Sequence, residues 1–392
     1  MISDNIYITD ERRMIQQTAA AFTNREVLPL ANALDPVKGD IPDDLIRKMA
    51  DMGYFGIKIP EVFGGLGLGA VEYCIVTEEL SRGWMSVGSL IARTNTLIGF
   101  DVMSDKKKSD LLPRMAAGEV ISAAALSEPG VGSDLASISC RAHEDGDDWI
   151  INGSKYWVTY ADRADIIYVC ARTDPPRDPQ RRYQGLSLFE IRKERGEFPA
   201  GMSGSTIPKI GYFGFRTYEL AFDSFRIPGD SLIGERGKAF YYLSKGLEVA
   251  RVHTAARSIG QAQGALNVAI DYATQRIQFN HPISDFQAIR FKIANMATEI
   301  EAARLLMYHV CHQIDTGRRC DKEASMAKYY AAEMAERVTS EAMQILGGAG
   351  YTTHFPVERY WRDARLTKIF EGTSEIQQRI ISDHILGKPT HA

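Results

Sequence analysis

The spacing of apolar residues changes twice along the chain and divides it into three parts. In the last part, apolar residues recur at alternating intervals of four and three, the period of a helix that packs lengthwise against others. The longest series covers three heptads and reads Ile289, Ile293, Met296, Ile300, Ala303, Met307 and Val310. The preceding helix carries Ala256, Gly260 and Gly264 at four-residue spacing, which lets another backbone approach closely. Residues 232–392 are therefore predicted to form a helical bundle.

The first part, residues 1–120, also has helical patterning. Thr9 or Asp10 can cap a helix that runs to Leu30, and a second helix is predicted from Asp43 to Met52. The glycine-rich loop 64–69 leads into a third helix over about 70–81. Since no strand precedes this loop, we interpret its glycines as turn and packing residues and not as a dinucleotide fingerprint.

The middle part, residues 121–231, contains short runs of β-branched and aromatic residues separated by turn residues. The runs 149–153, 166–170 and 186–190 predict antiparallel strands of a small barrel or sandwich. The proline- and arginine-rich stretch 175–182 is expected to be a solvated hairpin loop. The fold class is thus mainly α with a central β domain, in three domains.

Composition narrows the classes of function. The 392 residues carry a net charge of −4, which gives no indication of a nucleic-acid partner. The charged N-terminus does not resemble a signal peptide, and no apolar segment approaches the length of a membrane span. Five scattered cysteines indicate reduced thiols and a cytoplasmic protein. His309, Cys311 and His312 lie close together, but the helix around them favours structural roles, so no metal is predicted.

The run Ile369–Gln377 places a single carboxylate, Glu371, on a glycine-containing turn just ahead of a helix. Ser374 and Gln377 have the spacing of a capping box, and the helix is expected to end at Gly387. Burial beside Ile369 and Phe370 would raise the pKa of Glu371 and suit it to remove a proton from carbon.

Four other clusters contain candidate ligand-binding residues. The turn 126–134 exposes backbone N–H groups that can bond a heterocycle or a phosphate. Trp157–Val158–Thr159 places a flat aromatic beside a hydroxyl at a strand end. The run 276–287 carries an arginine that could clamp a pyrophosphate or simply cap a helix. The glycines of 344–351 end a helix and permit close approach of a ligand.

In this order and spacing, the five clusters resemble the acyl-CoA dehydrogenase family of flavoenzymes, and the resemblance covers essentially the whole chain. It implies an N-terminal helical domain, a middle antiparallel β barrel and a C-terminal four-helix bundle. It also implies FAD held between the last two domains, a homotetramer built as a dimer of dimers, and an electron-transfer flavoprotein as acceptor.

The resemblance implies a role for each matching residue. Glu371 is the base, because the position beside the bundle arginine that some branches use is here Ala250. The expected contacts to acyl-CoA come from Ser133, Arg251 near the base, Arg93 and Gly372. The expected contacts to FAD come from Leu126, Ser127, Gly132, Ser133, Trp157, Thr159, Arg276, Phe279, Gln287, Gln344, Gly347, Gly348, Thr373 and Glu375. Asn280 and Ser127 stand where the family usually has glycine and threonine, and neither change threatens FAD binding much.

Within the family, the stretches 81–94, 199–202 and 211–223 resemble the branch that oxidises methylsuccinyl-CoA or benzylsuccinyl-CoA. An arginine in an otherwise apolar acyl pocket would be costly unless it met an anion. Arg93 is therefore a candidate to pair with a free carboxylate of the substrate, and the alternative is a structural pair with Glu78 or Glu79. A short- or medium-chain monocarboxylic substrate, an oxygen-reactive oxidase and a nucleic-acid-binding member of the fold are the other hypotheses.

Overall fold

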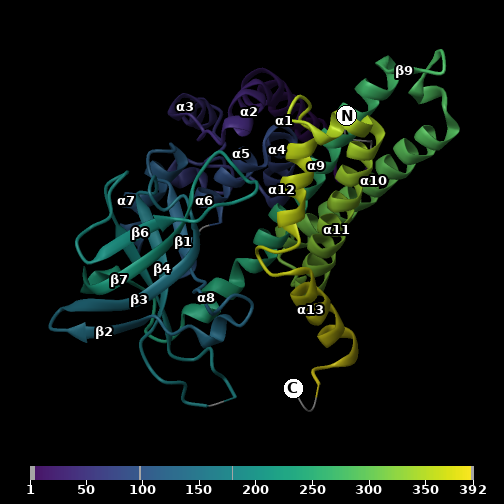
Figure 1. Cartoon of the computed structure of the whole chain (residues 1–392). Coiled ribbons are helices and arrows are strands. Elements are labelled where there is room, and N and C mark those ends of the chain that lie inside the picture. The colour runs from purple at the N-terminus through teal and green to yellow at the C-terminus, as the bar shows by residue number, and fades with distance from the viewer. Residues whose placement is uncertain (1–4, 97–98, 179, 390–392) are drawn as a thin grey trace.

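The computed structural model describes residues 5–96, 99–178 and 180–389. A β-sheet domain lies beside a bundle of long helices, and the N-terminal helices pack across both (Figure 1). The N-terminal helices are α1 (Asp10–Phe22), α2 (Leu28–Leu34), α3 (Asp43–Asp51), α4 (Ala70–Gly83), α5 (Met85–Leu90), α6 (Ala92–Asn95) and α7 (Asp105–Ala116).

Local signals explain where several of these helices begin. The Thr9 hydroxyl accepts a hydrogen bond from the N–H of Arg12 and caps α1, as predicted. A π-helical turn, Thr23–Val27, joins α1 to α2, so the helical segment continues past the predicted end at Leu30. The Asp315 carboxylate accepts hydrogen bonds from Ala70 and Val71 at the N-terminus of α4.

The glycines before α4 are turn and packing residues, as predicted. A Cβ on Gly65 would lie 2.0 Å from the carbonyl oxygen of Ile59, and one on Gly69 would lie 2.5 Å from the Asp315 carboxylate. Both positions are too close to other atoms to admit a larger residue.

The sheet has eight strands in the order β6-β7-β3-β2-β4-β5-β8, with β1 paired to β4. Most neighbours are antiparallel, as expected, but β1 runs parallel to β4, and β2 meets β4 in one parallel pair. The chain makes the β2–β3 hairpin between β1 and β4, which allows the two to run in the same direction. The strands are β1 (Ser122–Ala125), β2 (Arg141–Asp145), β3 (Asp148–Thr159), β4 (Ile166–Arg172), β5 (Leu186–Arg192), β6 (Met202–Thr206), β7 (Thr217–Pro228) and β8 (Leu232–Ile233).

The C-terminal bundle is organised around one central helix. α9 packs against α4, α10, α11 and α12 through the buried apolar residues of the bundle core. Close approach depends on its small residues, because a Cβ on Gly260 would lie 2.4 Å from the carbonyl oxygen of Glu78 in α4. The helices are α8 (Ala239–Lys245), α9 (Leu247–Gln275), α10 (Gln287–Asp315), α11 (Asp321–Leu346), α12 (Val357–Thr367) and α13 (Ser374–Leu386).

A small hairpin, β9 (Ile277–Gln278) and β10 (His281–Pro282), projects from the bundle at the end opposite α13 (Figure 1). Phe279 at its tip is 85% exposed. Phe279 and Asn280 both have positive φ, 53° and 67°.

Candidate active site

The turn between α12 and α13 has an unusual backbone. Glu371 and Gly372 both have positive φ, 54° and 87°. For glutamate this conformation costs about 1–2 kcal/mol. The carbonyl of Gly372 accepts hydrogen bonds from Lys328 Nζ at 2.7 Å and Gln377 Nε2 at 3.1 Å, which holds the strained turn in place.

The Glu371 carboxylate points at α9 and makes two short contacts there. Oε1 lies 2.5 Å from Nη2 of Arg257, and Oε2 lies 2.5 Å from the hydroxyl of Thr254. The Arg257 side chain is buried, with 2% exposed, whereas the Glu371 side chain is 35% exposed. The carboxylate is thus fixed by a buried cation, and the Glu371 side chain remains partly exposed.

The expected rise in the pKa of Glu371 is wrong. Burial does disfavour the charged form, but the Arg257 guanidinium and the Thr254 hydroxyl outweigh it and hold the pKa of Glu371 below its usual value. Sequence reasoning placed the carboxylate in an apolar setting and missed the arginine that faces it.

Arg251, expected near the base, lies elsewhere. Its guanidinium is near Asp321 at the start of α11, with Nη1 3.7 Å from Oδ1. Arg257 takes the place next to Glu371. The signal that could have found it is Thr254-x-x-Arg257, a pair on one face of a buried helix.

An aromatic wall continues from the Glu371 turn. The Arg257 guanidinium lies over the Phe370 ring at 4.5 Å. Phe370 meets Tyr212 edge-on, and Tyr212 meets Phe215 edge-on at 4.8 Å. The Arg93 guanidinium lies 5.5 Å from the Phe215 ring, at the other end of this wall.

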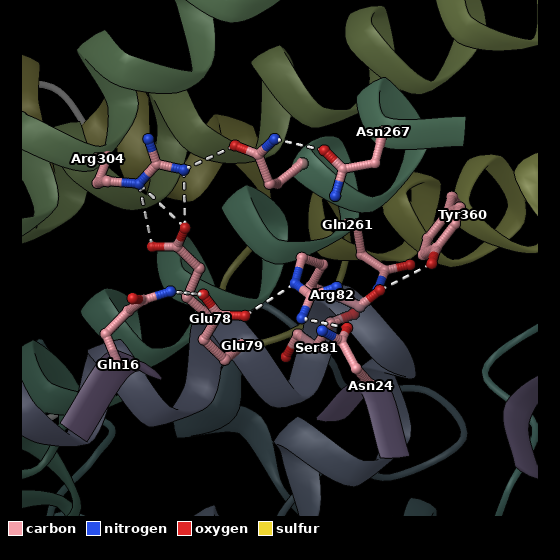
Figure 2. Close-up of polar contacts among 11 residues, drawn as sticks. Gln16, Asn24, Glu78, Glu79, Ser81, Arg82, Gln261, Asn267, Arg304 and Tyr360 are labelled. Atoms are coloured by element: carbon pink, nitrogen blue, oxygen red, sulfur yellow. Dashed lines mark hydrogen bonds and ion pairs between the residues drawn. The ribbon is translucent and has the colours of Figure 1, made fainter. Parts of the chain in front are cut away.

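Arg93 does not pair with the glutamates of α4, so the structural alternative predicted for it is wrong. Figure 2 shows these glutamates occupied by other partners. Glu78 pairs with Arg304 at 2.8 Å, and Glu79 pairs with Arg82 at 2.8 Å.

Within the described residues, Arg93 has no ion pair, and its buried Nε has no hydrogen-bond partner. Nη1 makes one long contact, 3.4 Å, to the carbonyl of Ser122. Burial lowers the pKa of Arg93, but an arginine stays charged in proteins. Arg93 is a partly buried cation that can still accept an anion.

The loop of Leu126, Ser127, Gly132 and Ser133 follows β1 and is anchored to β3. Lys155 Nζ donates to the carbonyl of Leu126, and the Tyr156 N–H donates to that of Ser127. A Cβ on Gly132 would meet open space, so this backbone is accessible.

The same part of β3 carries Trp157 and Thr159. A register shift between Lys155 and Val158 interrupts the pairing with β7. Trp157 has φ 62° and is 57% exposed, which fits a bulge that re-aims a side chain. The Thr159 hydroxyl bonds that of Thr217 at 3.2 Å. A flat ring beside an open loop can cover a planar heterocycle.

A second group of predicted residues gathers at the hairpin end of the bundle. Arg276, Gly347 and Gly348 line a cavity of about 500 Å³. Gln344 lies one turn before those glycines, Gln287 begins α10, and Phe279 is at the hairpin tip. The predicted site residues therefore form three groups: one at the Glu371 turn, one at the loop after β1 and the bulge of β3, and one at the hairpin end of the bundle.

Thr373 and not Ser374 caps α13, which corrects the predicted capping box. The Thr373 hydroxyl accepts from the N–H of Ile376, while the Ser374 hydroxyl donates to Glu333. Glu375 in the first turn is exposed, and its pKa is lowered by hydrogen bonds from its own backbone N–H and the Thr373 hydroxyl.

No group of three or more His, Cys, Asp or Glu side chains is placed to share a metal ion in residues 5–96, 99–178 and 180–389. Over the same described ranges, no helix is long and apolar enough to pass through a bilayer.

Three models of acyl-CoA dehydrogenase domains match the chain. The N-terminal domain matches residues 9–119, the middle domain 123–225 and the C-terminal domain 237–386. The chain belongs to the acyl-CoA dehydrogenase family. Members of this family are FAD-dependent oxidoreductases that act on acyl-CoA thioesters, and the chain is such an enzyme.

Relatives of this dehydrogenase span the whole fold. It is 40% identical over 387 residues to (2S)-methylsuccinyl-CoA dehydrogenase of Cereibacter sphaeroides. This match covers 97% of this chain and 70% of the relative. It is 37% identical over 391 residues to CarC, a subunit of the caffeyl-CoA reductase–Etf complex of Acetobacterium woodii, covering 98% and 100%. A Mycobacterium smegmatis glutaryl-CoA dehydrogenase in complex with FADH2 has a TM-score of 0.90 at 27% identity, covering 98% and 97%.

The residues present fit FAD. The open Gly132 loop and the exposed Trp157 offer backbone donors and a flat surface for a planar ring system. Arg276 beside the open Gly347 and Gly348 backbone offers a cation and close approach for a pyrophosphate.

Proposed function

We propose that Glu371 is the base that removes the α-proton from the acyl-CoA thioester. Its position supports this assignment, since a strained turn directs one partly exposed carboxylate at the site and two fixed donors orient it. When bound, FAD supplies the acceptor for the hydride that leaves the β-carbon.

Proton removal leaves negative charge on the thioester carbonyl. We expect the backbone N–H of Glu371 to donate a hydrogen bond to that oxygen, because this N–H lies on the same turn as the base. The apolar wall of Phe370, Tyr212 and Phe215 excludes water and strengthens the hydrogen bonds within the site.

The proposed substrate is the CoA thioester of a 2-substituted succinate, such as methylsuccinyl-CoA or benzylsuccinyl-CoA. Arg93 carries this proposal: it is a partly buried cation without a carboxylate partner among the described residues, and Glu78 and Glu79 pair with other arginines. A free substrate carboxylate beside the guanidinium would neutralise it. The likeness to a methylsuccinyl-CoA dehydrogenase supports the same substrate class.

The remaining proposals concern the electron acceptor, the oligomeric state and the cellular location of the enzyme. The likeness to CarC supports an electron-transfer flavoprotein as acceptor. The exposed hairpin with Phe279 supports FAD sites shared between protomers of a homotetramer. The five cysteines are free and buried, which supports a reducing, cytoplasmic location.

The test is anaerobic bleaching of the flavin by butyryl-, glutaryl-, methylsuccinyl- and benzylsuccinyl-CoA. We expect the fastest reduction with one of the two succinate derivatives. Faster reduction by butyryl-CoA would show that the natural substrate is a short monocarboxylic acyl-CoA and would reject the proposed class.

A further inference from the structure

The Arg257 guanidinium is fixed on several sides. Nη1 donates to the Ser89 hydroxyl at 3.0 Å, and Nη2 donates to Thr254 at 2.9 Å and to Glu371 at 2.5 Å. Phe370 covers its face. In the described part of the chain, Glu371 is the only carboxylate that forms an ion pair with it.

Positive charges outnumber negative ones around this pair. α9 also contributes His253, which is neutral because burial and Arg257 lower its pKa to about 3. α11 contributes Lys328, whose ammonium donates to Gly372 and whose pKa burial lowers to about 8. The other groups that face the pair are Arg93 from α6, Tyr73 from α4 and Tyr212 from the loop before β7.

This excess of positive charge opposes transfer of the proton to Glu371 in the proposed reaction. In the reaction the Cα–H bond would break, its electron pair would enter the new C=C bond and its proton would go to Glu371, while bound FAD would supply the acceptor for the β-hydride. Protonation of Glu371 removes the counter-charge of a buried arginine, and an uncompensated buried charge is strongly unfavourable. A second anion near Arg257 would remove that penalty.

We infer that Arg257 is a positioning residue that holds Glu371 as an oriented carboxylate, and that a free carboxylate on the acyl group compensates Arg257 while Glu371 carries the proton. This inference rests on the proposed function. It gives a reason for substrate selection beyond binding: a neutral acyl chain leaves Arg257 uncompensated at the moment of proton transfer. Burial and, less strongly, the charge of Arg257 lower the pKa of Arg93, so the two cations act on each other across the site. A substrate carboxylate held by Arg93 therefore also offsets the charge of Arg257.

The experiment compares holoenzymes carrying Arg257→Gln and Arg257→Lys. Arg337→Gln is the matched control, because Arg337 pairs with Glu299 at 2.7 Å on the exposed surface of the bundle. The first measurement needs no turnover. Infrared difference spectra of wild type minus Glu371→Gln, and of each Arg257 variant minus its Glu371→Gln double variant, follow the carbonyl stretch of protonated Glu371 against pH.

We expect the pKa of Glu371 to rise by about 1–3 units in Arg257→Gln, because an opposite charge at this distance shifts a carboxyl by that amount. It should stay near the wild-type value in Arg257→Lys and in the control. The second measurement is the rate of anaerobic flavin reduction. The ratio of methylsuccinyl-CoA to butyryl-CoA rates should fall roughly tenfold in Arg257→Gln, in line with one pKa unit.

An unchanged pKa of Glu371 in a folded, flavin-loaded Arg257→Gln would overturn the inference, and so would an unchanged substrate ratio. Should Arg257→Gln fail to fold, Thr254→Val replaces it. We expect a smaller rise in the pKa of Glu371 in Thr254→Val. An unchanged pKa of Glu371 in that variant would overturn the inference. Failure of every CoA ester to bleach wild-type flavin would reject the proposed function alone, since the infrared titration is read without substrate.

Discussion

The Asp363 carboxylate of α12 accepts a hydrogen bond from the backbone N–H of Tyr212 at 2.6 Å. The contact ties the helical bundle to the loop whose tyrosine forms the wall beside Glu371. Burial, and then the nearby Asp35, raise the pKa of Asp363 to about 7. The residue is therefore protonated over much of the range in which most aspartates are charged.

A dependence of stability on pH follows. The pKa of Asp363 is higher in the folded protein than in the unfolded chain. Asp363 therefore contributes most to stability below about pH 4, and this contribution is lost as the pH rises through about 7. Asp363→Asn keeps an oxygen acceptor for Tyr212 and should flatten the fall in melting temperature between about pH 4 and pH 7. An equally steep fall in the variant would assign the dependence to other groups.

Glu371→Gln should retain FAD and lose flavin reduction by substrate. General-base catalysis contributes about 10²–10⁴-fold, and the amide cannot accept the proton. The visible spectrum reports FAD content, and stopped-flow bleaching reports the rate. Reduction at the wild-type rate would show that another residue is the base.

Arg276→Ala should weaken FAD retention and loosen the oligomer together. Arg276 lines the cavity beside Gly347 and Gly348, next to the projecting hairpin. Flavin content after gel filtration and mass by light scattering test the two effects. Arg290→Ala, an exposed arginine in the first turn of α10, is the control. A fully flavin-loaded monomer would contradict the shared-site arrangement.

Arg93→Ala should change the order of substrates. Loss of this cation should slow methylsuccinyl-CoA more than butyryl-CoA, by about tenfold or more, because charge-assisted hydrogen bonds contribute about 1.5–3 kcal/mol. Arg93→Lys keeps the charge, and its rate with methylsuccinyl-CoA should lie between those of the wild type and Arg93→Ala. The measurement is the rate of flavin bleaching by the same four CoA esters. An unchanged order of these rates in Arg93→Ala would show that Arg93 does not contact the substrate.

Lys155→Met should destabilise the sheet domain. Lys155 Nζ lies 2.9 Å from Oε1 of Glu128 and is fully buried. Removing one partner of a buried ion pair costs about 3–5 kcal/mol, because the other charge is left uncompensated. The double variant Lys155→Met/Glu128→Gln should be less destabilised than Lys155→Met in thermal unfolding. A larger loss in the double variant would show that Glu128 contributes through Ser139 and Cys140 instead.

The sequence by itself determined the secondary structure and the order of the elements, because these follow from local periodicity and capping. Thr9 begins α1 and the heptad seam of α10 is buried from Met296 to Val310, as the pattern indicates. The clusters that mark the family are also local runs of residues. Glu371 could be singled out for that reason.

Tertiary structure decided the partners of the charges. Arg251 and Arg257 are six residues apart on one helix. Only the packing of α11 and α12 against α9 decided that Arg257 meets Glu371 and Arg251 meets Asp321. The occupied glutamates of α4 and the partnerless Nε of Arg93 follow from packing in the same way. Local propensity sets where a helix lies in the chain, but the pKa of a carboxylate depends on charges that are distant in sequence and near in space.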